Sequence, residues 1–200
     1  MKISRDRAAA NRDGVVEAAS KLFRDRGVDG VGIDAVMAAA GLTAGGFYKT
    51  FGSKEDLVVE AFAAALESTV DGLRRTEATD GTVWQAFVDS YLCPQHRDGR
   101  AEGCALVALS ADAGRRKGST SEVFAKGVDA FIGSVGDILP ASSQARRREE
   151  AVMATAAMVG ALTLARAVGI GALSEELMQT VRSSLLLLSS AHDRPENPEP

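Results

Sequence analysis

The chain has 200 residues, 46% of them hydrophobic, with 5 prolines and a formal net charge of −4. That length can bury a substantial core, and the composition, without strand-like alternation of apolar and polar residues, predicts a globular protein that is almost entirely helical. The N-terminus has no apolar signal-peptide core and no apolar run reaches the length of a bilayer span, so we expect a cytoplasmic protein. Two cysteines are too few for a disulfide framework.

The charges are distributed unevenly along the chain. Residues 1–52 carry 8 Lys and Arg against 6 Asp and Glu, whereas residues 53–200 carry 15 against 21. A mildly basic N-terminal part on an acidic body can still bind nucleic acid. Its salt dependence should be moderate, because few phosphates are neutralised.

The N-terminal residues divide into an arm and a helix. Residues 1–10 lack apolar periodicity, so we expect a mobile arm, and both a solvated tail and a basic arm that contacts phosphates or the minor groove stay open. From Asn11 to Arg26 apolar residues recur at helical spacing, and Gly27 should end the helix. This helix is predicted to support the segment that follows.

Residues 32–57 are predicted to form two short helices, a tight turn between them and the start of a longer helix. The first helix should begin near Asp34 with Gly32 as its N-cap. Gly41 can adopt the left-handed conformation that ends a helix and turns the chain. Thr43 is a suitable N-cap for the second helix, over 44–50.

The second short helix has two different faces. Phe47 and Phe51, four residues apart, should be buried and hold it in place. Gly45 and Gly46 weaken a helix, which makes sense if its backbone must lie close to something bulky, such as a DNA major groove. Tyr48 and Lys49 lie on the same outward face and could contact phosphates or base edges.

These residues resemble a known family. The helix-turn-helix of the tetracycline-repressor (TetR) family of bacterial transcription regulators is closely matched by Gly41-Leu42-Thr43, Gly45, Phe47-Tyr48, Phe51, Ser53-Lys54-Glu55 and Leu57. The resemblance is clear over residues 8–67 and covers the rest by length and helical pattern. It implies an all-α fold of about nine helices: a three-helix DNA-binding domain (1–52), a C-terminal effector-binding and dimerisation domain (53–192) and a disordered tail (193–200).

The resemblance and the outward face together give the candidate DNA contacts. Ser53 should cap the long helix, and Lys54 with the helix amides would form an anion site for a phosphate. The predicted DNA-binding residues are Thr43, Ala44, Gly45, Gly46, Tyr48, Lys49, Thr50 and Lys54.

The C-terminal body should consist of further helices. We expect the stretches 94–102 and 114–118 to be solvated loops, and the apolar stretch 151–165 to be buried on every side. The predicted helices cover 54–75, 82–93, 103–113, 119–139, 151–165 and 174–191. The last two carry more apolar surface than one core can absorb, which indicates a homodimer built as a four-helix bundle.

The resemblance also implies a small-molecule cavity in the body. Its candidate lining residues are Trp84, Phe87, Tyr91, Cys104, Phe124, Phe131, Met153 and Met158, although ordinary core packing accounts for most such residues in a helical domain. Cys104 stands at the start of a short helix, where it could sense oxidants or electrophiles or simply be a small buried residue.

No cofactor, metal or catalytic site is expected. Cys93, His96 and Cys104 match no common zinc spacing, and His192 lies in a charged tail. No nucleophile elbow or phosphate loop is present. We therefore expect a repressor that binds a palindromic operator as a dimer and is released by a small molecule. A transcriptional activator, and a ligand-binding dimer with a degenerate DNA-reading head, stay open as alternatives.

Overall fold

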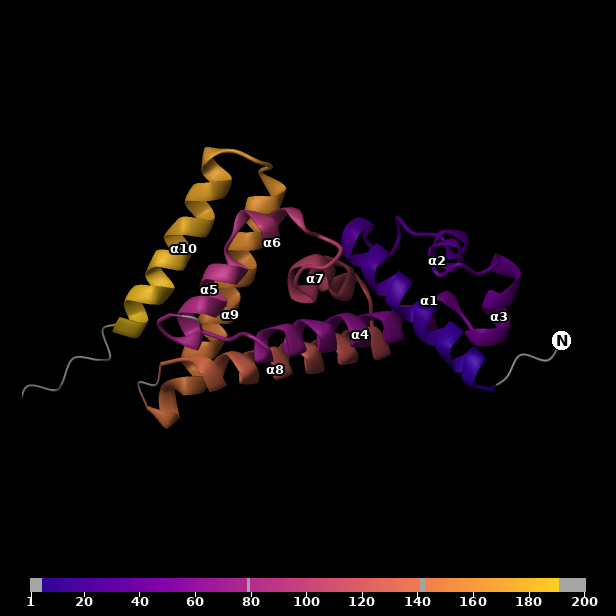
Figure 1. Ribbon diagram of the computed structural model, residues 1–200, viewed down its shortest axis with the longest axis horizontal. Coiled ribbons are helices and arrows are strands. Elements are labelled where there is room, and N and C mark those ends of the chain that lie inside the picture. The colour runs from indigo at the N-terminus through magenta and orange to yellow at the C-terminus, as the bar shows by residue number, and fades with distance from the viewer. Residues whose placement is uncertain (1–4, 79, 141–142, 191–200) are drawn as a thin grey trace, which may run out of the picture. The chain divides into compact units, whose positions relative to one another are not determined.

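The computed structural model describes residues 5–78, 80–140 and 143–190, with side chains as far as residue 187. Over these ranges the chain is helical throughout, with ten α-helices, one 3-10 helix and no strand (Figure 1). The predicted all-α fold is confirmed, with one more α-helix than expected. The elements are α1 (Arg5–Arg26), α2 (Ile33–Ala39), η1 (Ala44–Gly46), α3 (Phe47–Thr50), α4 (Lys54–Arg74), α5 (Val83–Tyr91), α6 (Pro94–Asp98), α7 (Ala105–Arg115), α8 (Ser119–Ile138), α9 (Gln144–Ala167) and α10 (Ala172–Ser190).

The chain divides into two compact units. Unit 1 comprises Met1–Thr69 and Arg100–Val128, and unit 2 comprises Val70–Gly99 and Asp129–Pro200. The units meet at three points in the chain: two fall inside the long helices α4 and α8, and the third, after Gly99, lies between α6 and α7. This division follows packing, whereas the predicted boundary at residue 52 separates functions and stays a prediction.

In unit 1, helix α1 packs against α2 and α7. Its buried stripe includes Val15, Ala19 and Phe23, at the spacing of one helix face. Where α8 crosses α4, a Cβ on Gly127 would lie only 2.7 Å from the Leu66 side chain, so this crossing requires glycine. The result is a small core that holds the N-terminal helices.

The N-terminal arm was predicted incorrectly for the residues that the structure describes. Helix α1 begins at Arg5, so residues 5–10 form its first turns. Three consecutive alanines favour the helix, and Asp6 lies near its positive end. Residues 1–4, His192 and the predicted tail at 193–200 lie outside the described residues.

In unit 2, α10 packs along α9 and also contacts α5, and α6 packs against α9. Trp84, fully buried on α5, donates its indole N–H to the carbonyl of Leu185 on α10 over 3.4 Å. The side chain of Thr82 caps α5 by accepting a hydrogen bond from the amide of Gln85. These contacts join the start of α5 to the C-terminal helix pair.

The predicted loop at 94–102 contains a short helix with buried polar contacts. Pro94 begins α6, where a proline costs no hydrogen bond. Arg97 is buried and donates to the Ser174 hydroxyl and to the Asp98 carboxylate. Burial lowers the pKa of His96, against a raising effect of its hydrogen bond with the Tyr91 carbonyl.

The stretch 151–165 of α9 is not buried on every side. Met153 is 69% exposed and Leu164 is 53% exposed, although Met158 between them is fully buried. One face of α9 is therefore open in the single chain. By length and composition α9 could cross a membrane, contrary to the expectation that no apolar run is long enough, and core helices of soluble proteins share these two properties.

Candidate nucleic-acid interface

The turn between α2 and η1 follows the prediction. Gly41 has a φ of +70°, the left-handed region that side chains rarely adopt. The Gly41 amide donates to the Ala38 carbonyl, and the Leu42 amide donates to the Met37 carbonyl over 2.9 Å. These bonds satisfy carbonyls at the end of α2 and redirect the chain.

The second short helix is less regular than predicted. It starts as the 3-10 turn η1 and becomes the single α-helical turn α3. Thr43 occupies the N-cap position, but its side chain makes no capping hydrogen bond. A helix of this length cannot be stable alone, so tertiary contacts must hold it.

Two buried phenylalanines supply those tertiary contacts, as predicted. Phe47 and Phe51 are almost fully buried, and their rings stack with centroids 5.5 Å apart. The rest of the segment stays open: Thr43, Ala44, Gly45, Tyr48, Lys49 and Thr50 are exposed and Gly46 is half-buried. The predicted DNA-binding residues of 43–50 are therefore exposed or half-buried, with Phe47 buried among them; residues 43–50 are here called the reading segment.

Neither glycine of the reading segment is required by the protein itself. Both have a φ outside the left-handed region. A Cβ on Gly45 would meet no heavy atom within 4 Å, and one on Gly46 would make an ordinary contact of 3.7 Å with Met37. Open backbone at Gly45 suits the close approach of an external partner.

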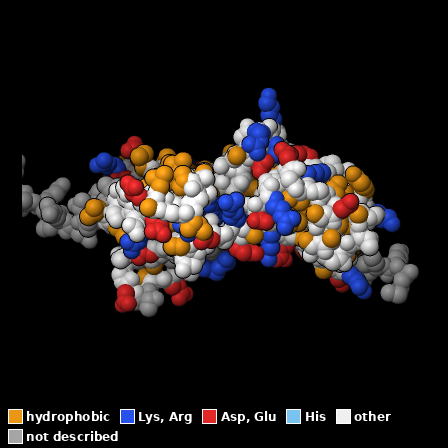
Figure 2. All heavy atoms as spheres, turned by 90° about the horizontal axis from the view of Figure 1, so that it is seen from above, with side chains coloured by type: hydrophobic (Ala, Val, Ile, Leu, Met, Phe, Trp, Pro, Cys, Tyr) orange, Lys and Arg blue, Asp and Glu red, His pale blue; other side chains and the backbone are white. Residues whose placement is uncertain are grey.

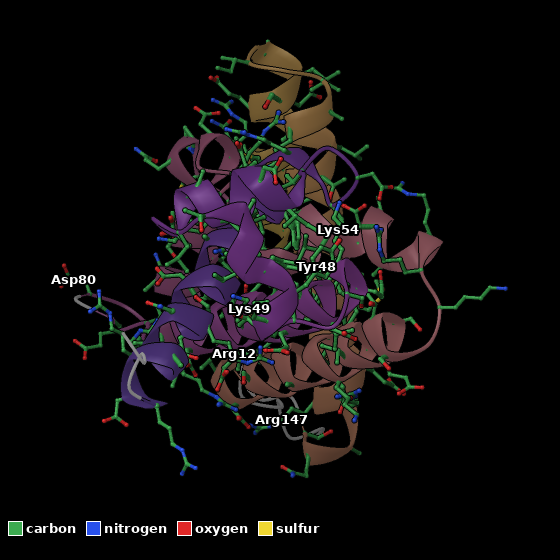
Figure 3. All side chains as sticks on the ribbon, turned by 90° about the vertical axis from the view of Figure 1, so that its right-hand side faces the viewer. Arg12, Tyr48, Lys49, Lys54, Asp80 and Arg147 are labelled. Atoms are coloured by element: carbon green, nitrogen blue, oxygen red, sulfur yellow. The ribbon has the colours of Figure 1, made fainter. Side chains whose placement is uncertain are left out.

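Tyr48 and Lys49 are the most prominent side chains of the reading segment. Tyr48 is 72% exposed, although its ring also packs edge-on against Phe47 with centroids 5.1 Å apart. In Figure 3, which looks onto the N-terminal helices, Tyr48, Lys49 and Arg12 all lie on the side facing the viewer. A large exposed aromatic hydroxyl beside a lysine can contact phosphates or base edges.

Lys54 has internal partners. Its ammonium donates to the carbonyls of Val28, over 2.9 Å, and Val31, over 2.7 Å. These bonds fix the connection between α1 and α2 to the start of α4. Ser53 caps α4 as predicted, since its hydroxyl accepts from the Asp56 amide over 3.1 Å. The phosphate contact predicted for Lys54 would require its ammonium to leave these carbonyls or to share itself with them.

Sequence reasoning missed Arg12. Its guanidinium donates to the Thr50 carbonyl over 3.1 Å, pairs with the Glu60 carboxylate, and lies over the Phe51 ring at 4.4 Å from its centroid. Arg12 precedes Val15 by three residues, so it extends the buried stripe of α1. That position was the only available signal, because nothing in the sequence pairs residue 12 with 50 or 60.

A second missed cluster joins α7 to the connection before α2. Asp112 is buried and accepts hydrogen bonds from the Val28 amide and from Arg116. Arg116 also pairs with Asp29 over 2.7 Å, and this hydrogen bond is the main reason that the pKa of the Asp29 carboxyl is lowered. Arg116 is only 16% exposed, so the prediction of a simple solvated loop at 114–118 is wrong for this residue.

The candidate effector residues fall into separate groups. In unit 2, Trp84, Phe87, Tyr91 and Phe131 form an aromatic cluster with ring centroids 5.6–6.4 Å apart. Met158 is fully buried, whereas Met153 is 69% exposed.

Two further candidates belong to unit 1. The Phe124 ring lies edge-on to that of Phe62, with centroids 6.4 Å apart, and Cys104 is buried at the N-cap of α7.

An open groove of about 530 Å³ lies between α1 and α4 in unit 1, and none of the predicted effector residues lines it. Small residues such as Ala63 and Ala64 form part of its wall. Its charged residues are Asp13, Glu17, Lys21, Arg24, Glu60, Glu67 and Glu102. The groove is more acidic than basic, unlike the reading segment.

Comparison with known proteins agrees with this geometry. Residues 15–61 match the family described as "Bacterial regulatory proteins, tetR family". No curated relative matches the sequence.

Several solved structures share the fold of nearly the whole chain. A TetR transcriptional regulator from Chloroflexus aurantiacus J-10-FL is 23% identical, with 92% of this chain and 96% of that chain covered and a TM-score of 0.75. A TetR-family regulator from Cytophaga hutchinsonii is 18% identical, with 93% and 97% covered and a TM-score of 0.73. The reduced form of Escherichia coli NemR is 19% identical, with 88% and 95% covered and a TM-score of 0.71.

The matched segment contains α2, η1, α3 and most of α1, and thus the whole reading segment. The helix-turn-helix segment of this chain is thus similar to the tetR family of bacterial regulatory proteins, and the chain as a whole has the fold of the solved TetR-family structures.

Proposed function

We propose that this chain is a cytoplasmic, DNA-binding transcriptional regulator that acts as a homodimer, represses from a palindromic operator and is released by a small molecule. The observation that carries the proposal is the reading segment. Its apolar residues are buried beneath it, while Tyr48 and Lys49 project outward and Gly45 leaves the backbone open. We propose no enzymatic activity for this chain.

The integrity of this head argues against the ligand-binding rival with a degenerate reading head. Gly32 occupies the N-cap position of α2 as predicted, without a side-chain hydrogen bond. Phe47 and Phe51 are packed and Gly41 makes the turn. Tyr48, 72% exposed, is accessible for a contact with DNA.

The dimer part of the proposal rests on the open apolar face of the C-terminal helices. Met153 and Leu164 are eleven residues apart on α9, so they lie on one face of that helix. Figure 2 shows apolar side chains gathered on the half of the molecule that holds α9 and α10. The exposed large apolar residues of this region are Val152, Met153, Leu164, Val168, Ile170, Leu173 and Leu187.

Pairing α9 and α10 with their copies in a second chain would bury this face in a four-helix bundle. Two-fold symmetry then gives two reading segments. If they are about 34 to 36 Å apart, they meet the same face of DNA one turn apart and read a palindrome.

The release step follows from differential affinity. A small molecule that binds better to a non-DNA-binding conformation shifts the population toward it. The aromatic cluster of Trp84, Phe87, Tyr91 and Phe131 is the proposed contact region for an apolar or aromatic effector.

The test is fluorescence-anisotropy binding of the purified protein to the DNA that flanks its own gene, against scrambled DNA, across a salt series. The proposal predicts tight, sequence-specific binding with a moderate salt slope. Equal and weak binding to both duplexes would favour the ligand-binding rival. A reporter gene behind the bound sequence then separates repression from activation, because loss of the protein raises expression only for a repressor.

A further inference from the structure

Arg12 connects three elements around the reading segment. It stands on α1, and its guanidinium donates one hydrogen bond to the Thr50 carbonyl at the end of α3. Another nitrogen of the same group pairs with Glu60 on α4, and the guanidinium lies over the Phe51 ring. Two nitrogens and one face of this guanidinium therefore contact other parts of the protein.

These contacts stabilise α3, which is too short to satisfy its own last carbonyls. The last carbonyls of any helix lack partners within the helix, and α3 consists of only four residues. Arg12 supplies a donor to one of those carbonyls. Glu60 in turn fixes the guanidinium, because an arginine held by a carboxylate loses less freedom when it binds a second acceptor.

We propose that Arg12 is a positioning residue for DNA recognition: held by Glu60, it fixes the end of α3 and thereby the direction in which Tyr48 and Lys49 project. The inference rests on the proposed DNA-binding function. Lys54 fixes the connection between α1 and α2 in a similar way, by donating to the carbonyls of Val28 and Val31.

A direct phosphate contact is the competing role for an arginine on this side of the molecule. The two roles predict opposite effects of Glu60→Gln. If Arg12 contacts a phosphate, the substitution releases the guanidinium, removes a negative charge near DNA and tightens binding. If Arg12 is a positioning residue, Glu60→Gln loosens α3 and weakens binding, although the same negative charge has been removed.

The first arm of the experiment measures affinity and its salt dependence. The probe is the duplex that the parent protein enriches most from a random-sequence pool. We expect Arg12→Gln to weaken binding about fivefold and Glu60→Gln about threefold, with the parent's salt slope retained in both; a lost phosphate contact would lower the slope by about 1.

Matched controls keep the charge changes equal. Lys21→Gln removes one positive charge from α1, at a residue whose ion pairs are with Glu17 and Glu102. Glu67→Gln removes one negative charge from α4, seven residues after Glu60. Both controls should leave affinity within about twofold of the parent, because Lys21 and Glu67 line the groove between α1 and α4, not the reading segment.

The second arm does not depend on DNA. Amide hydrogen exchange of residues 47–51, which include the Phe51 amide bonded to the Phe47 carbonyl, should be at least about fivefold faster in Arg12→Gln and Glu60→Gln than in the parent and the controls. Unchanged exchange in both variants, or tighter DNA binding by Glu60→Gln, overturns the inference. If the parent enriches no DNA sequence, the proposed function fails, and the exchange arm still decides whether Arg12 holds α3.

Discussion

The molecule exposes two surfaces that suit binding partners, the reading segment and the apolar face of α9 and α10, and their chemistry is different. The reading segment presents Tyr48, Lys49 and bare backbone at Gly45. The face of α9 and α10 presents Met153, Leu164 and other apolar side chains. A polar aromatic and a cation suit nucleic acid, whereas an apolar stripe on paired helices suits a copy of itself.

The two faces are also supported differently. The reading segment consists of a 3-10 turn and four α-helical residues, so it depends on buried aromatics and on side chains from other helices. Helices α9 and α10 have 24 and 19 residues and pack along each other. Substitutions on the two faces should therefore separate DNA binding from dimerisation.

The largest expected effect is on the reading segment. Replacing Tyr48 and Lys49 together by alanine should weaken operator binding at least about a hundredfold, because two exposed DNA contacts are lost while the core beneath is unchanged. Fluorescence anisotropy measures the affinity, and light scattering checks that the dimer persists. Lys126→Ala, an exposed lysine on α8, is the control; retained binding by the folded double variant would remove the segment from the DNA interface.

A substitution on the apolar face of α9 should weaken dimerisation. Leu164→Glu places a charge in the proposed bundle and should raise the dimer dissociation constant by about a hundredfold, since an unpaired buried charge costs several kcal/mol. Sedimentation equilibrium measures the constant. Val83→Glu, at a partly exposed residue of α5, should leave the dimer intact, and an equal loss in both variants would contradict a specific interface.

Gly45 offers a finer separation of folding from binding. Because a Cβ there meets nothing within 4 Å, Gly45→Ala should raise the free energy of unfolding by up to about 1 kcal/mol and weaken DNA binding about tenfold. Denaturant unfolding and anisotropy measure the two changes. Gly133→Ala, equally unobstructed on α8, should leave DNA binding unaltered, whereas DNA binding unaffected by Gly45→Ala would argue against a close backbone approach.

The smallest expected effect is on the pH dependence of the unfolding free energy, through His96 in unit 2. The pKa of His96 is lowered, chiefly by burial, from an ordinary value of 6.5, so the folded protein favours the neutral ring. The unfolding free energy should thus keep this contribution above about pH 6.5 and lose it as pH falls toward the folded pKa. His96→Asn should flatten the stability profile in that window; an unchanged slope would mean that His96 does not contribute.

The sequence predicted best what local chemistry dictates. The turn at Gly41, the buried pair Phe47 and Phe51 and the cap at Ser53 depend on neighbours a few residues away, and all are as expected. The irregular start at η1 was not predictable, because tertiary packing overrides the preference of so short a segment.

Long-range polar contacts were beyond sequence reasoning. Arg12 meets Thr50 and Glu60, and Asp112 meets Val28, across intervals that no local pattern records. The buried Arg97 in a stretch predicted to be a solvated loop is a similar case, since its partner Ser174 lies 77 residues away. For α9, composition alone overstated burial, because an apolar face that the single chain leaves exposed has the same residue types as a core face.

The most direct test is a selection of DNA bound by the purified protein from a random-sequence pool, followed by footprinting of the enriched duplex. The account predicts a palindrome with two protected half-sites about 10 base pairs apart, centre to centre, for the parent, and no enriched sequence for the Tyr48→Ala, Lys49→Ala double variant. A folded, dimeric parent that enriches no sequence would contradict the proposal that this chain reads DNA.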